Sequence, residues 1–413
     1  MERRRVVITG LGAVTPIGLT AMESWQAVKD GVCGVAPITQ FDPTGMKVQL
    51  AAEVKGFVPE NYMSKPEAKR MARFTQLAVV SAKEALENAG FTLDEAEADR
   101  CGVIVSSGIG GLFLTEAEHD KGKEKGWDRV SPFYIPMGIC NMAAGQIAIH
   151  TGFRGMCSCP VTACTGGTNA VGDAFHYIRD GYADVMLCGG AESAVTPLAI
   201  GAFTSMKALT QNPDPDRASI PFDAERSGFV LGEGAAILLL EELEHAKARG
   251  ARIYAEVVGY GATCDAYHMT APRPDGSGGA KAMEMALADG GVKADEVDYI
   301  NAHGTSTPLN DAGETTAVKT VFGDHAYQLA ISSTKSMTGH MLGAAGAVEA
   351  LFCAKALQEG YLPATINYQV PDPACDLDVV PNQGRSADVR YALSNSLGFG
   401  GHNGSLLFKK WEA

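Results

Sequence analysis

The sequence predicts an α/β fold in which helices cover both faces of its sheets. Three observations support this. Short β-rich runs alternate with longer amphipathic runs along the 413 residues, 46% of the residues are hydrophobic, and the 48 glycines are typical of many tight turns and close backbone contacts. A chain of this length can bury a large core, as two domains or as one large α/β unit.

The first series of predicted elements ends near residue 250. Gly90 is expected to end a helix, and the pair Gly189–Gly190 is expected to end a strand. The predicted strands cover residues 5–9, 102–106 and 184–188, and the predicted helices cover residues 67–89 and 167–179.

A second series follows the charged segment 241–252, which is the predicted boundary between an N-terminal half, 1–250, and a C-terminal half, 251–413. The strand-then-glycine openings near Val6 and Ala255 are loosely similar, so an internal duplication is plausible. The second series comprises strands at 253–261 and 297–301 and helices at 279–288, 311–322 and 343–357.

Charge and hydropathy exclude some classes of function. A formal charge of −14 argues against a surface built mainly to hold nucleic acid, although local basic patches remain compatible with it. The apolar run at 6–8 ends at Gly10–Gly12, and no apolar run approaches the roughly 18–20 residues of a membrane span. We therefore expect a cytoplasmic protein.

The ten cysteines are sparse in a chain of this length and lie mostly in apolar contexts, so they are expected to be reduced thiols. Cys157 and Cys159 form the one close pair. Because no second pair or histidine lies at metal-binding spacing, the sequence predicts no metal site there.

Cys164 lies in Val161-Thr162-Ala163-Cys164-Thr165-Gly166-Gly167, where a buried segment is expected to turn into the helix 167–179. At a helix N-terminus the unpaired N–H groups stabilise a thiolate and lower the thiol pKa. Two interpretations stay open from this segment alone. Cys164 is either an activated nucleophile or a small core residue at a strand–helix junction.

Two downstream blocks contain residues that can act with such a cysteine. His303 ends the apolar run in Asn301-Ala302-His303-Gly304-Thr305, and His340 ends Lys335-Ser336-Met337-Thr338-Gly339-His340. The C-terminal ends of strands are where the sites of α/β sheets collect. Glu349 lies on an apolar helix, so its carboxylate needs a partner, for which Lys335 or a backbone network are the candidates.

Two glycine-rich segments resemble nucleotide-binding motifs but lack essential positions. Gly10-Leu11-Gly12-Ala13-Val14-Thr15 has Thr15 where the third glycine of a dinucleotide fingerprint belongs, and Gly108-Ile109-Gly110-Gly111 lacks the Lys-Ser/Thr ending of a phosphate loop. We therefore reject a nicotinamide oxidoreductase and expect no bound cofactor.

Taken together, these blocks closely resemble the β-ketoacyl-acyl carrier protein synthases, and within them the synthase II type of the thiolase superfamily. The cysteine block, Asn-Ala-His-Gly-Thr-Ser-Thr at 301–307 and Lys-Ser-x-Thr-Gly-His at 335–340 occur in the order of that family, and the likeness extends to Asn395-Ser396-Leu397-Gly398-Phe399-Gly400-Gly401. Pro221-Phe222-Asp223, the segment 228–234 and the loop 265–272 agree with it. The resemblance covers essentially the whole chain.

The resemblance implies a five-layered αβαβα thiolase fold of two similar halves, a homodimer, and an acyltransferase that elongates fatty acyl chains by two carbons. It implies that Cys164 accepts the acyl group from acyl carrier protein, that His303 and His340 promote decarboxylation of the malonyl thioester, and that Lys335 supports the histidines. Phe399 matches a gating phenylalanine whose N–H, with that of Cys164, forms an oxyanion hole. Substrate-contacting roles are implied for Ile109, Phe203, Thr270, Thr305, Thr307 and Gly400, and a supporting role for Glu349.

Several implied features are less direct. Thr165 stands where alanine or serine is frequent and is expected to reshape the pocket mouth. Asn301, Glu349 and Ser394 match positions around an alkali cation in related enzymes. A carrier-docking patch is expected at Lys65, Lys69, Arg70, Arg129 and Lys207.

Two alternatives to fatty acid elongation remain open. A polyketide-type ketosynthase shares these motifs. A non-catalytic chain-length partner also resembles them but typically lacks the nucleophile, whereas Cys164 is present here.

Overall fold

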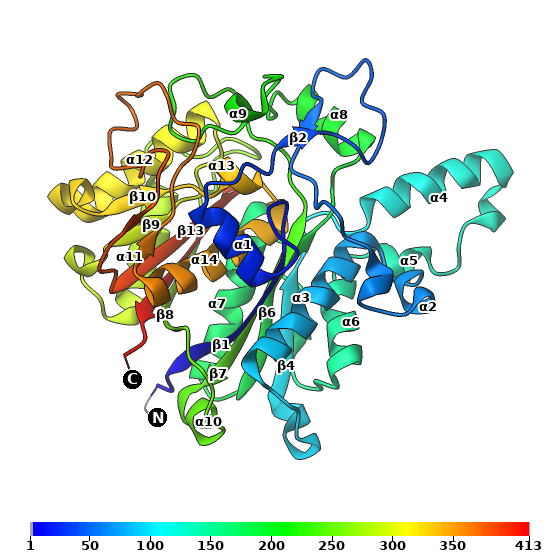
Figure 1. The fold of residues 1–413 in the computed structure, drawn as a ribbon, viewed down its shortest axis with the longest axis horizontal. Helices are drawn as coiled ribbons and strands as arrows, with labels where there is room; N and C mark the ends of the chain where they lie inside the picture. Colours follow the sequence, from blue (N-terminus) through cyan, green and yellow to red (C-terminus); the bar gives the residue numbers. More distant parts are fainter. Residues whose placement is uncertain (1–2, 413) are drawn as a thin grey trace.

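The computed structural model describes residues 3–412, in which a ten-stranded sheet runs in the order β10-β9-β13-β14-β8-β1-β7-β6-β4-β5 (Figure 1). Its strands are β1 (Val6–Val14), β4 (Cys101–Ser106), β5 (Cys157–Ser158), β6 (Val185–Glu192), β7 (Gly234–Glu242), β8 (Ala255–Cys264), β9 (Tyr299–Asn301), β10 (Ala330–Ser332), β13 (Tyr391–Gly398) and β14 (His402–Lys410). Two short pairs, β2 (Ala36–Pro37) with β3 (Leu50–Ala51) and β11 (Tyr361–Leu362) with β12 (Arg385–Ser386), lie apart from it.

The sheet consists of two five-strand arrays with the same internal order. From β5 inward the pairings β5–β4, β4–β6, β6–β7 and β7–β1 are parallel, parallel, antiparallel and antiparallel. From β10 inward the pairings β10–β9, β9–β13, β13–β14 and β14–β8 repeat this pattern. A short antiparallel contact between β1 and β8, at Val6–Ile8 against Ala255–Val257, joins the arrays. This repetition agrees with the two similar halves implied by the resemblance.

Helices cover both arrays and separate them. α3 (Arg73–Ala89) and α6 (Met142–Thr151) pack on the outer face of the first array, and α11 (Ser277–Gly290) packs on the outer face of the second beside α12 (Pro308–Phe322). α7 (Gly166–Arg179) and α14 (Ala345–Glu359) contact each other and strands of both arrays. The five-layered αβαβα fold is confirmed, with α7 and α14 as its central layer (Figure 1).

The remaining helices are short or lie at the periphery, and α4 extends away from the body of the molecule (Figure 1). They are α1 (Ala21–Lys29), α2 (Lys65–Ala68), α4 (Leu112–Lys125), α5 (Tyr134–Gly138), α8 (Pro197–Ser205), α9 (Pro215–Ala218), α10 (Leu243–Ala248) and α13 (Lys335–Thr338). Across residues 3–412 no helix combines the length and the apolar character needed to cross a membrane.

The predicted elements are present, with four differences in their bounds. The single helix predicted at 67–89 is two helices, because the chain is extended at Ala72 and the Gln76 side chain donates to the freed carbonyls of Ala68 and Met71. The predicted boundary 241–252 contains α10, and the sheet runs continuously across it. The division at 250/251 stays a prediction. The third difference concerns β6, which runs through Gly189 and Gly190 to Glu192, so the expectation that these glycines stop the strand is wrong. The fourth difference concerns β1.

β1 is five residues longer than predicted at its C-terminal end, because Gly10 and Gly12 are strand residues rather than a loop. A Cβ added to Gly12 would lie 1.9 Å from the Ser81 carbonyl oxygen, and one on Gly10 would lie 2.2 Å from that of Ala85. These glycines therefore allow α3 to pack directly on the strand. This explains the incomplete dinucleotide fingerprint without a nucleotide.

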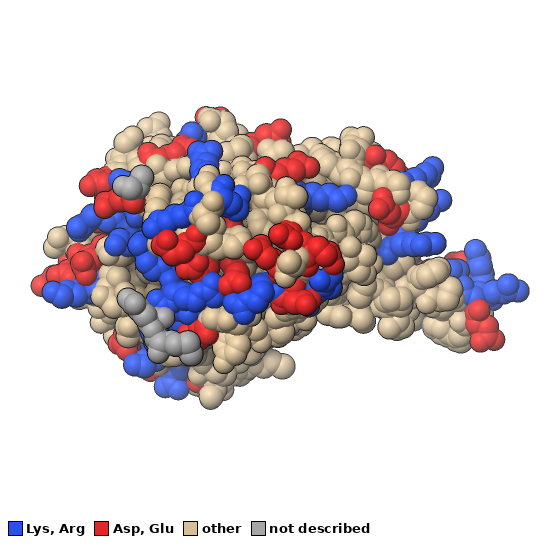
Figure 2. Space-filling model, turned by 90° about the horizontal axis from the view of Figure 1, so that it is seen from below, with Lys and Arg blue, Asp and Glu red and all other residues tan. Residues whose placement is uncertain are grey.

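Charges are interspersed on the face that carries both termini (Figure 2). Arg4 pairs with Asp184 there, and Arg5 pairs with Glu256 through two hydrogen bonds of 2.8 and 2.7 Å. Cations and anions are mixed among the described residues of this face, so its charge is not wholly basic.

We expect Gly12→Ala to lower the free energy of unfolding by about 1–3 kcal/mol, because the new methyl group overlaps the α3 backbone. Urea denaturation of both proteins measures the difference. Gly201→Ala, in α8, is the matched control, because a Cβ there meets nothing within 4 Å. Equal destabilisation by the two substitutions contradicts the proposed role of Gly12.

Candidate active site

Cys164 lies in a short 3₁₀ turn, Ala163–Thr165, that leads directly into α7. Ala163 has a φ of 51°, in the left-handed region that non-glycine residues seldom adopt. A Cβ on Gly166 would lie 1.9 Å from the Ser106 hydroxyl oxygen, so the turn has no room for a larger residue there. The chain thus presents Cys164 on a strained, tightly packed corner.

Thr165 is fully buried, and its hydroxyl donates to the Thr162 carbonyl oxygen at 2.7 Å. The expectation that Thr165 reshapes the pocket mouth is wrong, because it is not among the residues that line the cavity. Its hydroxyl instead closes the turn that carries Cys164.

Cys164, His303 and His340 line one cavity of about 630 Å³. His303 follows β9, and His340 follows α13 just before the 3₁₀ turn Leu342–Ala344 and α14. The two imidazole rings are 5.2 Å apart between centroids and lie at 87° to each other. The structure therefore brings together three residues that are separated by up to 176 positions in the chain.

Burial sets the protonation of these three groups. It lowers the pKa of both His303 and His340 well below the usual value, and the positive charge of Lys335 lowers both further. Both imidazoles are therefore neutral near pH 7. Burial also raises the pKa of the Cys164 thiol to about 12, while Lys335 and the Phe399 N–H lower it by less. The expectation that a helix N-terminus leaves a low thiol pKa is wrong, because desolvation of the thiolate dominates.

Lys335 and Glu349 form a buried ion pair beside the histidines. Both side chains are almost inaccessible, and the Lys335 ammonium group donates to Glu349 Oε1. Burial raises the pKa of Glu349 to about 7, and the lysine charge opposes that shift. Of the two candidate partners for Glu349, the structure therefore selects Lys335.

Glu314, on α12, is a functional residue that the sequence did not reveal. Its carboxylate accepts the N–H groups of His303 at 2.9 Å and Gly304 at 2.8 Å. Burial raises the Glu314 pKa to about 7. The only sequence signal was its position eleven residues after His303.

Five of the six predicted substrate-contacting residues line the cavity, namely Ile109, Phe203, Thr270, Thr305 and Thr307. Gly400 is not among the lining residues, because it lies in the exposed turn between β13 and β14. The cavity wall also includes Phe229, whose ring packs edge-on against both His340 and Phe203. No sequence signal distinguished Phe229 from an ordinary core aromatic.

Phe399 follows β13 and lines the cavity, and its N–H faces the Cys164 thiol. A Cβ on the preceding Gly398 would lie 3.2 Å from the Cys164 nitrogen, so these two backbone segments are in close contact. This juxtaposition fits the predicted pairing of the Cys164 and Phe399 N–H groups. The gating movement of Phe399 stays a prediction.

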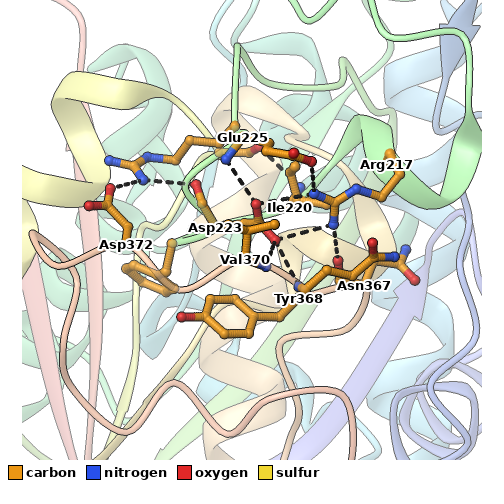
Figure 3. Close-up of polar contacts among 12 residues, drawn as sticks. Arg217, Ile220, Asp223, Glu225, Asn367, Tyr368, Val370 and Asp372 are labelled. Carbon is orange, nitrogen blue, oxygen red and sulfur yellow. Dashed lines mark hydrogen bonds and ion pairs between the residues drawn. The ribbon is translucent and has the colours of Figure 1, made fainter.

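Arg226 fixes the loop that carries Thr305 and Thr307. It is 8% exposed and donates to the carbonyl oxygens of Thr307 at 3.2 Å and Pro308 at 3.1 Å. Its guanidinium also pairs with Asp372, an acidic residue of the network in Figure 3. Arg226 is therefore a positioning residue for this side of the cavity.

The polar network around Asp223 also supports the loop that carries Thr305 and Thr307 (Figure 3). Asp223 accepts hydrogen bonds from Arg217 and from the N–H groups of Gln369 and Val370. The neighbouring Ile220 N–H donates to the hydroxyl of Ser306, which has a φ of 67°. The Pro221-Phe222-Asp223 motif is thus part of a brace for the His303 loop.

Three buried side-chain oxygens near the ion pair fit a monovalent cation. Asn301 Oδ1, Glu349 Oε2 and Ser394 Oγ have no hydrogen-bond partner among the described residues. Asn301 and Ser394 are paired on neighbouring parallel strands, and α14, which carries Glu349, packs on β13. Oxygen ligands suit hard cations, so these three oxygens would be ligands of an alkali ion.

A cysteine that faces two neutral imidazoles can hold an acyl group as a thioester while an anion forms beside it. Within an αβαβα fold, this combination defines the class of thiolase-fold acyltransferases.

The comparisons identify the family within that class. The model of the N-terminal domain of beta-ketoacyl synthase matches residues 3–246, and the model of its C-terminal domain matches residues 254–369. The chain therefore belongs to the beta-ketoacyl synthase family, which confirms the resemblance described above.

Relatives match over the full chain. It is 52% identical to 3-oxoacyl-[acyl-carrier-protein] synthase 2 of Synechocystis sp., over 100% of this chain and 99% of that protein. It is 50% identical to the protein of the same name from Staphylococcus aureus, over 100% of both chains.

Solved structures match with a TM-score of 0.92. One is the AntDE:AntF complex of a type II PKS acyl-carrier protein with its ketosynthase, which is 36% identical over 100% of both chains. Another is a beta-ketoacyl synthase from Burkholderia phymatum, which is 37% identical over 99% of this chain and 100% of that chain.

We expect Lys335→Met to raise the pKa values of His303 and His340, because it removes the charge that helps to keep both imidazoles neutral. Diethyl pyrocarbonate reacts with neutral imidazole, so the pH dependence of its reaction with each histidine, mapped by mass spectrometry, reports the midpoint. The midpoints should move to higher pH in Lys335→Met and less in Lys335→Arg. Unchanged midpoints mean that burial alone keeps the rings neutral.

Proposed function

We propose that the protein is a 3-oxoacyl-[acyl-carrier-protein] synthase of the synthase II type, which elongates fatty acyl chains by two carbons in fatty acid biosynthesis. The observation that carries the proposal is the pair of neutral imidazoles beside Cys164 in one buried cavity. The curated relatives of that name, at 50–52% identity over the whole chain, support it.

The first half-reaction transfers an acyl group to Cys164. The sulfur attacks the thioester carbonyl of acyl carrier protein, a new C–S bond forms, and the carrier sulfur leaves with the thiol proton. Because the resting thiol is protonated, the attack needs an environment that stabilises charge as it develops. The N–H groups of Cys164 and Phe399 are suited to hold the oxyanion of this step.

The second half-reaction forms the carbon–carbon bond. The malonyl thioester loses carbon dioxide, and the electron pair of the broken bond becomes an enolate with charge on its thioester oxygen. Neutral imidazole N–H groups of His303 and His340 stabilise that oxygen, each by about 3–4 kcal/mol for a well-placed donor. The enolate carbon then attacks the Cys164 thioester, the C–S bond breaks, and the sulfur regains a proton.

The imidazoles are suited to this step because neither Nδ1 atom has a hydrogen-bond partner within the described chain. The rings are held by packing and by the Glu314 brace on the His303 backbone rather than by a carboxylate at the ring. An imidazole without a carboxylate partner stays neutral. Its N–H group can therefore donate a hydrogen bond to the enolate oxygen and keep its proton.

Acyl carrier protein is the proposed partner. Lys65, Lys69, Arg70, Arg129 and Lys207 are exposed, and among the described residues none of them has a carboxylate within 4 Å. Lys207 also lines the cavity. Unpaired surface cations favour an acidic carrier despite the overall charge of −14. The solved AntDE:AntF ketosynthase is in complex with an acyl-carrier protein, which supports this part of the proposal.

The ketosynthase of the solved type II PKS complex is 36% identical to this chain, below the 50–52% of the curated 3-oxoacyl-[acyl-carrier-protein] synthase 2 relatives, which favours fatty acid elongation over the polyketide-type alternative. A non-catalytic chain-length partner is disfavoured by Cys164 in its cavity. A cytoplasmic location belongs to the same proposal, supported by ten free cysteines, as expected in a reducing compartment.

We expect Cys164→Ala to abolish condensation while the protein still decarboxylates malonyl-carrier protein, because the imidazoles act on the malonyl group without the sulfur. His303→Ala and His340→Ala should each lower the decarboxylation rate by about 10²–10³-fold, since each removes one donor to the enolate oxygen. Mass spectrometry of the acyl adduct on Cys164 measures the acylation step, and release of carbon dioxide measures the decarboxylation step. Condensation by Cys164→Ala contradicts the mechanism.

We also propose a homodimer. β5 ends the sheet with a free edge, and the adjoining surface exposes Ile135 by 61%, Ile149 by 71% and Val161 by 54%. Sedimentation should give twice the chain mass of 43.3 kDa, and Ile149→Glu should shift it toward the monomer. Tyr182→Glu, equally exposed at 71%, is the control that should leave the dimer intact. A monomeric wild type contradicts the proposal.

A further inference from the structure

Glu192, the last residue of β6, is a buried carboxylate that the catalytic steps above do not use. Its side chain is inaccessible to solvent and has no cationic partner among residues 3–412. Oε1 accepts the Ser107 hydroxyl at 3.0 Å and the Ile109 N–H at 3.2 Å. Oε2 accepts the N–H groups of Gly108 at 2.8 Å and Gly343 at 3.1 Å.

The four donors belong to two different walls of the acyl cavity. Gly108 and Ile109 follow β4 and line the cavity on one side. Gly343 follows Leu342, another lining residue, whose φ of 46° is in the left-handed region. One carboxylate therefore joins the segment after β4 to the segment between His340 and α14.

The two walls are in close contact at this point. A Cβ on Gly343 would lie 2.7 Å from the Gly108 nitrogen and 3.0 Å from Glu192 Oε2. Ile109, Leu342 and Cys164 pack in the same hydrophobic cluster as Phe203 and Phe229. A small movement of either segment therefore changes the space beside the nucleophile.

Only a carboxylate satisfies this arrangement. Each oxygen accepts two hydrogen bonds, so a glutamine in either orientation would place its NH₂ group against two donors. Buried donors left without an acceptor are unfavourable, and the segments would separate to reach other partners. Aspartate is one methylene too short to reach both walls.

We propose that Glu192 is a positioning residue that fixes Ile109 against Leu342 and thereby sets which acyl chain lengths fit beside Cys164. This inference rests on the proposed function, because it assigns a specificity role within the same cavity. Glu192 touches neither the substrate nor the reacting atoms. It acts through the backbone of the two walls.

We expect Glu192→Gln to flatten the chain-length profile of Cys164 acylation. Acyl-carrier proteins with chains of different length are offered singly, and the rate of thioester formation is followed by intact-protein mass spectrometry. The ratio between the best and the poorest chain length should fall by about 10-fold or more, because the wall no longer holds one position. Ser107→Ala, which removes one of the four donors, should shift the ratio less and in the same direction.

A second readout separates positioning from a general loss of structure. The negative charge of Glu192 raises the pKa of the Cys164 thiol, so Glu192→Gln should move the pH profile of iodoacetamide alkylation of Cys164 to lower pH. Glu84→Gln is the matched control. Glu84 also accepts two backbone N–H groups, those of Ala13 and Ala21 at 2.8 Å, but neither of these residues lines the cavity.

The outcomes are distinct. A wild-type chain-length ratio in Glu192→Gln overturns the role of Glu192, and so does equal flattening in Glu84→Gln. If Glu192→Gln does not fold, an unchanged ratio in Ser107→Ala overturns it. Wild-type protein that forms no thioester on Cys164 with any carrier overturns the proposed function and this inference with it.

Discussion

The close packing of α7 on α14 is the constraint on which the site depends. A Cβ on Gly167 would lie 2.7 Å from the Ala347 nitrogen, and one on Gly346 would lie 2.2 Å from the Thr168 hydroxyl oxygen. The helices therefore touch through their backbones near their N-terminal ends. Cys164 lies two residues before the start of α7, and His340 lies five residues before the start of α14. Helix contact thus brings nucleophile and imidazole together, and every residue of α14 from Ala345 to Leu357 is buried.

Burial of the active site sets the protonation states of the cysteine and of both histidines. It disfavours every charged form, so it keeps the Cys164 thiol protonated and both imidazoles neutral. A site that contains no fixed anion at the reacting atoms does not repel the enolate that forms there. The charges that remain, on Lys335 and the buried carboxylates, are paired or hydrogen-bonded outside the reacting centre, where they hold backbone segments in place.

Much of this was predictable from the sequence, because periodicity is local and because the family resemblance implied the positions of the cavity residues. The alternation of strands and helices, Cys164 with its two histidines, and the cavity positions Ile109, Phe203, Thr305 and Thr307 lie where expected. The rest depends on contacts between distant segments. The thiol pKa is set by burial rather than by the local helix start, Gly10 and Gly12 serve helix packing, and Arg226, Glu192 and Glu314 bind backbone groups far away in the chain.

The short β1–β8 contact has a consequence for how the molecule is made. β1 is synthesised before the other strands of the sheet, but one of its edges stays open until Ala255–Val257 have been synthesised. Pairing of two strands that are some 250 residues apart is slow, because the entropy cost of closing the loop between them comes before any stabilising contact. A nascent chain that exposes β1, a strand whose residues are all buried in the finished fold, is prone to wrong pairing. Chaperone dependence during synthesis is the expected result, independent of how stable the finished fold is.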